Sequence, residues 1–485
     1  MSNKRLFKKV LSFLFITLLL VSITFPNAIR ASGKNTLKVK ENPKYIFYFI
    51  GDGMGAAQRQ LAEYYSKQNT GKKLTMNTLP IAGINTTHSE NSLITDSAAA
   101  GTALATGHKT KNGMLSKLPN GKDVKTLIEV AEEKDMSTGI ITTTRLTHAT
   151  PAAFASHNVN RSNENEIAVD YLDSGVDFFA GGGLRHFIPN NWTNDEKDAA
   201  DRTIKSKRED DRNLLEEFKD NGYITFYGKK GVKDFRDYKP KKDDKIFASF
   251  TDSHMPYEVD RLNSLYKNNV PTLSQMTQKG IETLSQNKKG FFLMVEGGRI
   301  DHASHTNDAV GVIKETIEFD NSVKIAYEFL KKYPKDTLIV VTADHETGGL
   351  SLGYDSNYFL KLDSLENVKV SVEDNLLNSY KGDKEKFLNY IGENFGLSNI
   401  TEQEKREIQD SIDLHNKGVT WGGYSPLAMS VTHILSRKAN INWGTYAHTA
   451  TQVPLSAIGS GAEHLGGYKD NTEVSQVLFK FLDKK

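Results

Sequence analysis

Side chains able to bind divalent cations recur in this sequence directly after short apolar runs. Asp52 and Glu296 each follow such a run, and Asp301 and His305 come soon after Glu296. Because Asp301 and His305 lie four residues apart, one helical turn would point both side chains in the same direction. Further carboxylate and imidazole groups come later, at Asp344, His345 and His448. Imidazole with carboxylate is a ligand set for Zn²⁺, and carboxylate with hydroxyl suits Mg²⁺, so the pattern predicts a centre of several metal ions.

Taken singly, each of these residues has an ordinary explanation. An Asp after a strand commonly caps a helix or closes a turn, and a lone His is more often a hydrogen-bonded surface or core residue. We give that ordinary interpretation to His88, His108, His186, His254, His415, His433 and His464. Several apolar runs that all end in such groups are not expected from turn chemistry alone, which favours the metal centre.

The segment Gly51-Asp-Gly-Met-Gly-Ala56 also fits the dinucleotide-binding pattern G-x-G-x-x-A. Asp52 argues against that interpretation, because a carboxylate inside the loop would repel a pyrophosphate. No acidic residue ends a second strand about 20 residues later, as that pattern requires. The glycines are better explained by close approach of the backbone to a metal-bound Asp52.

Ser97 is the candidate nucleophile, within the segment Ile94-Thr-Asp-Ser-Ala-Ala-Ala-Gly-Thr102. No His adjoins it, and the G-x-S-x-G turn of many hydrolases is absent. A bound Zn²⁺ would instead lower the pKa of the hydroxyl, as metal ions lower the pKa of water. We expect a tightly packed helix to begin at Ser97, with N–H groups that favour an anionic substrate. An Asp-capped, alanine-rich helix without chemistry is the structural alternative.

The elements that must position these residues are predicted from hydrophobic periodicity. Continuous apolar runs at 45–50, 138–142, 291–295 and 337–342 are typical of strands buried on both faces. Helical patterns at 124–134, 273–286 and 309–332 precede the last three. This alternation predicts an α/β fold, a three-layer sandwich with a mostly parallel central sheet. Ligands of such sheets gather at the carboxyl ends of the strands.

Two polar stretches interrupt the alternation. Residues 190–245 are rich in Lys, Asp and Glu and are interpreted as a solvated, partly helical insertion. Residues 360–443 are long, polar and weakly periodic. We expect them to form a surface insertion built on the sheet and not an independent domain.

The first 31 residues have the pattern of a signal peptide: basic residues, an apolar run over 10–25, then small residues before Ser32. An uncleaved anchor is the alternative. Removing the leader moves the formal net charge from +2 to about −3, so the mature chain, residues 32–485, gives no reason to expect a nucleic-acid partner. The chain has no Cys, which excludes disulfides and thiolate ligands. We expect a secreted or extracytoplasmic protein, with release or retention at the cell surface left open.

Together these residues resemble the alkaline phosphatase family, whose serine signature matches residues 94–102 at every position. The likeness extends from about Tyr45 to the C-terminus and implies a phosphomonoesterase that works through phosphoserine at Ser97. It implies two Zn²⁺ and one Mg²⁺ per chain. The implied ligands are Asp301, His305 and His448 for one zinc, Asp52, Ser97, Asp344 and His345 for the second, and Asp52, Thr150 and Glu296 for magnesium. Arg161 matches the arginine that clamps the phosphate.

Two positions depart from the best-known bacterial member of that family, which has Asp and Lys where this chain has His148 and His302. Both are therefore further candidates for the third metal site or for the surroundings of the phosphate. A nitrogen donor at His148 would shift that site towards zinc or cobalt. Family resemblance also implies phosphate monoester substrates, inorganic phosphate as product and a homodimer, and it likens residues 360–443 to the variable crown region.

Three functional hypotheses follow. The first is a secreted metal-dependent phosphomonoesterase. The second is a phosphodiesterase, sulfatase or phosphomutase of the same superfamily, which the Asp96-Ser97 pair, Arg161 and Glu296 disfavour. The third is an exported phosphate- or metal-binding protein without turnover, which the presence of Ser97 disfavours.

Overall fold

The computed structural model describes residues 42–193, 196–264 and 267–483. The chain divides into two units, Met1–Val39 and Lys40–Lys485, and everything below concerns the second. The predicted signal peptide lies outside the described residues. Within them, no helix has both the length and the apolar character needed to cross a membrane.

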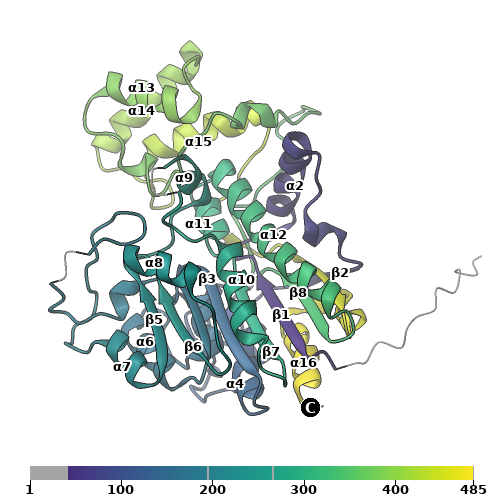
Figure 1. The fold of residues 1–485 in the computed structure, drawn as a ribbon. Coiled ribbons are helices and arrows are strands. Elements are labelled where there is room, and N and C mark those ends of the chain that lie inside the picture. Colours follow the sequence, from purple (N-terminus) through teal and green to yellow (C-terminus); the bar gives the residue numbers. More distant parts are fainter. Residues whose placement is uncertain (1–41, 194–195, 265–266, 484–485) are drawn as a thin grey trace, which may run out of the picture. The chain divides into compact units, whose positions relative to one another are not determined.

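A central sheet of ten strands organises the described residues (Figure 1). Its order is β12-β2-β11-β8-β1-β7-β3-β4-β6-β5. The strands are β1 (Tyr45–Ile50), β2 (Ile81–Thr86), β3 (Ser137–Arg145), β4 (Phe178–Gly182), β5 (Tyr223–Tyr227), β6 (Lys245–Ser249), β7 (Phe291–Glu296), β8 (Thr337–Thr342), β11 (Val453–Gly459) and β12 (Gly467–Asp470). Only β11 runs antiparallel to its neighbours, β2 and β8. The predicted mostly parallel α/β sheet is therefore confirmed.

Helices cover both faces of this sheet, which gives the expected three layers. One face carries α2 (Ala56–Thr70), α8 (Gly228–Asp237), α9 (Glu258–Asn263), α10 (Leu273–Leu284) and α12 (Ala309–Lys332). The other carries α3 (Ser97–Thr106), α4 (Leu127–Glu132), α5 (Ala149–Ala155), α6 (Glu164–Asp173), α7 (Leu214–Asp220) and α16 (Asn471–Asp483). Strand β1 shows why its sequence is apolar throughout: Phe47 and Phe49 enter the first core, whereas Ile46 and Tyr48 enter the second.

Residues 190–245 form more than the solvated, partly helical insertion that their composition predicts. They contribute β5, the edge strand of the main sheet, together with α7 and α8, and Lys245 begins β6. Phe218, Phe226 and Phe235 from this stretch are buried. An edge strand and amphipathic helices bury only one side. Polar residues on the other side alternate with the buried apolar ones and hide the apolar periodicity in the sequence.

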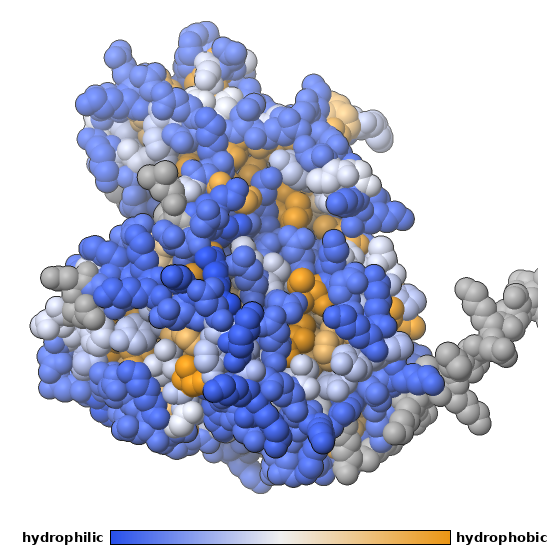
Figure 2. Space-filling view, in the orientation of Figure 1, coloured by the Kyte–Doolittle hydropathy of each residue, from blue (hydrophilic) through white to orange (hydrophobic). Residues whose placement is uncertain are grey.

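Residues 360–443, here named the crown segment, form α13 (Lys384–Phe395), α14 (Glu402–Asn416) and α15 (Pro426–Ala439), with short 3₁₀ turns before them. Apolar side chains such as Phe387, Ile391 and Ile412 join the core that also contains one face of the sheet. Surface-exposed side chains around α13 and α14 are mostly hydrophilic (Figure 2). The weak periodicity of the crown segment thus reflects helices with narrow apolar sides.

Candidate active site

The predicted ligands meet because four neighbouring strands end at one edge of the sheet. Strands β3, β7, β1 and β8 lie side by side, and Ile50 pairs with both Glu296 and Thr342. Asp52 therefore leaves β1 beside Glu296, and Asp344 follows β8 two residues after its end. Parallel strands bring their carboxyl ends to the same edge, and this brings together residues almost 300 positions apart.

Ser97 occupies the first position of α3, as predicted, and is 2% exposed. Asp96 caps the helix by accepting a hydrogen bond from the N–H of Ala99 at 3.0 Å. A Cβ on Gly101 would stand 3.3 Å from the Cα of Thr150, so the small residue lets α3 lie tightly against α5. Ser97 Oγ lies 3.2 Å from His345 Nε2. The start of α3 thus places the Ser97 hydroxyl within the ligand cluster.

A first ligand group comprises Asp52, Asp344 and His345, all with no exposed surface. His345 Nε2 lies 3.3 Å from an oxygen of each carboxylate. Gly53 holds the turn: its φ is +68°, and a Cβ there would come 2.9 Å from an oxygen of Asp301. This close approach is what the glycine-rich loop after β1 provides, in place of a nucleotide site.

A second group gathers Asp301, His305 and His448 around one point. Asp301 and His305 share α11 (Arg299–His305), with 3.3 Å between Asp301 Oδ2 and His305 Nε2. His448 Nε2 lies 3.2 Å from His305 Nε2 and 3.6 Å from Asp301 Oδ1. The Nδ1 atoms of His305 and His448 face the carbonyls of Tyr446 (2.7 Å) and Thr95 (2.8 Å). Donation from Nδ1 leaves both Nε2 lone pairs directed at the same point, as in metal sites.

His345 stands between the two groups, because its ligand atom also lies within reach of Asp301 and His448. The rings of His345 and His448 stack with centroids 3.6 Å apart. Strand β9 (Glu346–Thr347) pairs with β10 (His448–Thr449), which joins these distant parts of the chain. The two groups are therefore contiguous.

A third group contains Asp52, His148 and Glu296. Glu296 accepts hydrogen bonds from the hydroxyls of Thr142 and Thr144. The hydroxyl of Thr150 lies 3.5 Å from a carboxylate oxygen of Asp344. His148 thus offers a ligand atom to the third group, in line with the departure noted in the sequence.

The charge balance of these groups fits divalent cations. Burial, reinforced by the charges of Asp344 and Asp301, raises the pKa of Asp52 well above its usual range. Burial raises the pKa of Asp344 to about 8 and that of Glu296 to about 7. Both oxygens of Asp52, Oε1 of Glu296 and Nδ1 of His148 are buried without a hydrogen-bond partner among the described residues. Buried carboxylate oxygens that accept no hydrogen bond are costly, so this donor set fits bound metal ions.

We expect the metal-free protein to become less stable as pH rises from about 7, above the range in which the buried histidines titrate in the unfolded chain, to about 9. The folded state keeps a proton on Asp344 up to a pKa of about 8, and burial opposed by the Asp301 charge leaves the pKa of His305 at about 9. The unfolded chain loses these protons at lower pH, so unfolding releases protons and the free energy of unfolding falls with pH. Calorimetry of chelator-treated protein checks this.

Two controls accompany that measurement. Saturating zinc and magnesium should largely remove the pH dependence, and Asp344→Asn should flatten it in the metal-free protein. A melting temperature that rises with pH in the metal-free protein would contradict the assignment.

Arg161 reaches the site from the segment after α5. Its Nη1 lies 3.1 Å from Asp96 Oδ2, and its Nη2 lies 3.3 Å from His148 Nε2. The backbone N–H of Arg161 donates to the carbonyl of Gly113 at 2.8 Å. A half-buried guanidinium next to the start of α3 is placed to bind an anion held at Ser97.

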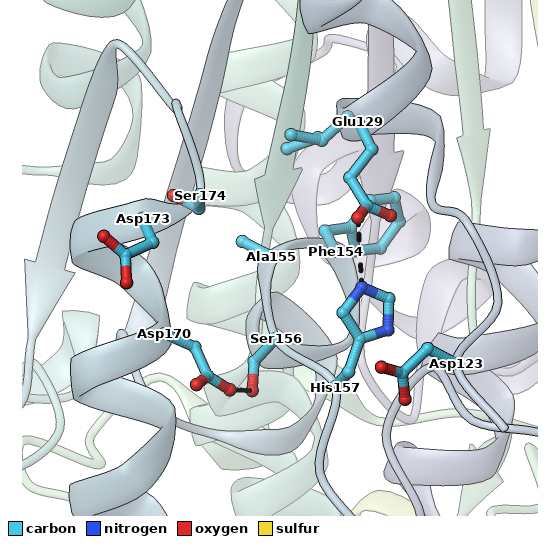
Figure 3. Close-up of a pocket in the computed structure, with 10 residues that line it drawn as sticks. Asp123, Glu129, Phe154, Ala155, Ser156, His157, Asp170, Asp173 and Ser174 are labelled. Atoms are coloured by element: carbon cyan, nitrogen blue, oxygen red, sulfur yellow. Dashed lines mark hydrogen bonds and ion pairs between the residues drawn. The ribbon is translucent and has the colours of Figure 1, made fainter. Parts of the chain in front are cut away.

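A pocket of about 350 Å³ lies beside the segment that leads to Arg161 (Figure 3). Within it, His157 lies between the carbonyl of Ser116 (2.8 Å) and the carboxylate of Glu129 (3.1 Å). Ser156 donates to Asp170 on the facing helix α6. None of the predicted site residues lines this pocket, so it lies outside the candidate active site.

His302 and one histidine that sequence reasoning missed lie beside His148. The ring centroids of His302 and His254 are 4.4 Å apart, and that of His148 is 5.5 Å from His302. His254 follows β6, a strand not predicted from the sequence. The apolar residues 246–250 were the available signal, because they would have placed His254 at the same sheet edge.

The crown segment also contacts this region, because two of its acidic residues bind Arg299, at the start of α11. The guanidinium is 1% exposed and lies 3.1 Å from Glu373 and 2.8 Å from Asp374. It also stacks on the ring of Tyr257 at 3.6 Å. Arg299 Nη1 lies 2.9 Å from His302 Nδ1, so the crown segment helps to fix the helix that carries Asp301 and His305.

Comparisons with known proteins agree with this geometry. The family model described as alkaline phosphatase matches residues 43–484. Alkaline phosphatase 4 of Bacillus subtilis is 33% identical, covering 91% of this chain and 89% of that protein. Alkaline phosphatase 3 of the same organism is 34% identical, covering 90% and 89%. The crystal structure of the Thermus thermophilus alkaline phosphatase has a TM-score of 0.77 at 28% identity, covering 92% of this chain and 93% of that one. A mutant alkaline phosphatase of the Antarctic bacterium TAB5, at 26% identity and TM-score 0.63 over 91% of this chain and 99% of that one, has Mg bound in its M3 site.

These matches span nearly the whole described chain and confirm the resemblance found in the serine signature. They coincide with a sheet edge at which carboxylates, imidazoles and a buried serine converge. The chain therefore belongs to the alkaline phosphatase family and is a phosphatase.

Proposed function

We propose that this chain is a secreted, metal-dependent phosphomonoesterase that transfers the phosphoryl group of its substrate to Ser97 and then to water. The observation that carries the proposal is the buried Ser97 hydroxyl, 3.2 Å from His345 and at the start of α3, within a cluster of four buried carboxylates. Two chemical steps, each with an oxygen nucleophile, replace one difficult displacement.

We further propose two Zn²⁺ and one Mg²⁺ per chain. The first zinc would be held by Asp301, His305 and His448, and the second by Asp52, Ser97, Asp344 and His345. Asp52, Thr150 and Glu296 would hold the third ion, and His148 in that group also makes zinc or cobalt a suitable occupant. When bound, the two zincs would lower the pKa of the attacking hydroxyl or water and stabilise charge on the entering and leaving oxygens.

The chain's own groups complete this mechanism. Ser97 attacks phosphorus from the N-terminus of α3, whose N–H groups favour the anionic phosphoryl oxygens. Arg161 binds two of these oxygens and orients the group for in-line displacement. No residue in this scheme needs to contact the alcohol of the ester, so a broad range of monoesters is expected, with an alkaline optimum.

Replacing Arg161 by Ala is expected to lower kcat/KM for a monoester by about 10- to 100-fold, since one charged, bidentate contact to the phosphoryl group is lost. Steady-state kinetics and inhibition by inorganic phosphate measure this. Arg161→Lys should restore part of the loss. Unchanged phosphate inhibition in Arg161→Ala would remove Arg161 from the phosphate site.

The reaction class is tested by comparing p-nitrophenyl phosphate with bis(p-nitrophenyl) phosphate at alkaline pH. A monoester offers one more charged, non-bridging oxygen to Arg161 and to the three ligand groups, so we expect it to be hydrolysed at least about 100-fold faster. A diester that is the better substrate would favour the phosphodiesterase hypothesis. Binding of phosphate without hydrolysis of either ester would favour a protein without turnover.

Location and assembly belong to the same proposal. We propose export through the leader at 1–31, with residues 32–485 forming the mature catalytic chain and the crown segment as its variable insertion. A homodimer is proposed from the family resemblance. N-terminal sequencing of protein recovered from the culture medium, with light scattering of the same sample, measures both.

A further inference from the structure

Four ring side chains collect beside the group formed by Asp301, His305 and His448. They are Trp421, Tyr424, His433 and Tyr446, named here the aromatic cluster. Trp421 and His433 stack with centroids 6.1 Å apart and planes at 7°, and His433 and Tyr446 stack at 6.1 Å and 21°. Tyr424 lies 6.0 Å from Tyr446. Trp421, Tyr424 and Tyr446 pack against the hydrophobic core, and all four rings remain partly exposed to solvent.

The aromatic cluster is held in place by the backbone around it. The backbones of Trp421 and Tyr424 pair through two hydrogen bonds of 2.9 and 3.0 Å. Between them, Gly422 and Gly423 have φ values of +58° and +92°, which a tight type I′ turn requires. A Cβ on Gly422 would stand 2.5 Å from the Tyr446 ring, so only glycine fits there. The rings are thus ordered before any ligand arrives.

The aromatic cluster is also fixed to the candidate active site. The carbonyl of Tyr446 lies 2.7 Å from Nδ1 of His305, and Tyr446 precedes His448 by two residues. Burial, with the charges of Glu373 and Asp301, raises the pKa of Tyr424 to about 12. The rings therefore border the side of the site formed by the crown segment and His305.

We propose that the aromatic cluster binds the organic group of phosphate monoesters whose alcohol is a planar aromatic ring, and so favours aryl substrates. The inference rests on the proposed function. In an in-line displacement the leaving oxygen lies opposite Ser97, next to the Asp301, His305 and His448 group. The ring attached to that oxygen then emerges over the aromatic cluster, where stacking favours it over an aliphatic group.

The test uses the metal-loaded enzyme and two non-hydrolysable probes, phenylphosphonate and methylphosphonate, with dissociation constants from calorimetry. We expect phenylphosphonate to bind about 5- to 10-fold more tightly than methylphosphonate. Trp421→Ala and Tyr424→Ala should each reduce this ratio by at least about 3-fold and leave the methylphosphonate constant unchanged. Trp421→Phe should retain most of the preference. Tyr358→Ala, which removes a fully exposed ring elsewhere, is the matched control.

Three results would overturn the inference. One is an unchanged ratio in both alanine variants, and another is an equal loss for the two probes, which would indicate a structural role. The third is a change of oligomeric state in Trp421→Ala, which would make the aromatic cluster an interface between copies. Failure of the proposed function would look different, because wild-type enzyme would then neither bind methylphosphonate nor hydrolyse p-nitrophenyl phosphate.

Discussion

Ser97→Ala is expected to lower kcat for p-nitrophenyl phosphate by at least about 1,000-fold while the protein stays folded. The hydroxyl is buried and lies 3.2 Å from His345 in the ligand cluster, so the substitution removes the attacking oxygen. Alanine suits the first turn of α3, where Asp96 still caps the helix. The effect should therefore appear in catalysis and not in the melting temperature.

Acid-quenched samples give a second measure of the same residue. Wild-type enzyme should show phosphate on Ser97 by peptide mass spectrometry, and Ser97→Ala should show none. Ser162→Ala removes an exposed hydroxyl next to Arg161 and should keep full activity. Retention of more than about one-tenth of the activity by Ser97→Ala would remove Ser97 as nucleophile.

Removal of the metal ions should have an effect of comparable size. Asp52, Asp301, Asp344 and Glu296 are 0–4% exposed, and without cations burial raises the pKa of Asp52, Asp344 and Glu296 and so opposes the charged state that ligand chemistry needs. Chelation is expected to reduce activity below about one-thousandth and to lower the melting temperature. Zinc with magnesium, or cobalt, should restore both, and elemental analysis should give three metal ions per chain.

A single substitution separates the metal centre from general effects of chelation. Asp52 belongs to two of the ligand groups, so Asp52→Asn should lose both metal content and activity. Asp470→Asn alters a carboxylate that pairs with Lys109 at 3.0 Å away from these groups and should change neither. Full metal content in Asp52→Asn would contradict its proposed bridging role.

Much of this architecture could be predicted, because its central elements are buried on both sides. Strands β1, β7 and β8 and helix α12 follow apolar patterns whose limits nearly coincide with those in the structure. Strands β2 and β11 escaped prediction: β2 has one buried residue, Asn85, among partly and fully exposed ones, and β11 contains Pro454. Short strands near the edge of a sheet bury few residues. They therefore contain few apolar residues, and the sequence gives no clear strand pattern there.

The candidate site was likewise predicted only in part. Asp52, Glu296 and Asp344 stood out because each follows a strong strand signal. His254, Tyr446 and Arg299 did not, since their importance comes from neighbours brought together only by the fold. The position of His345 between two ligand groups is likewise a property of the pairing of β9 with β10.

Strand β1 has a consequence for how the chain acquires its shape. Its two partners in the sheet begin only at Phe291 and Thr337, so this buried, apolar strand stays unpaired until more than half of the chain has been made. Contacts between residues this distant in sequence slow folding and favour an aggregation-prone folding intermediate. Until those neighbours are made, Tyr45–Ile50 exposes apolar side chains that favour aggregation.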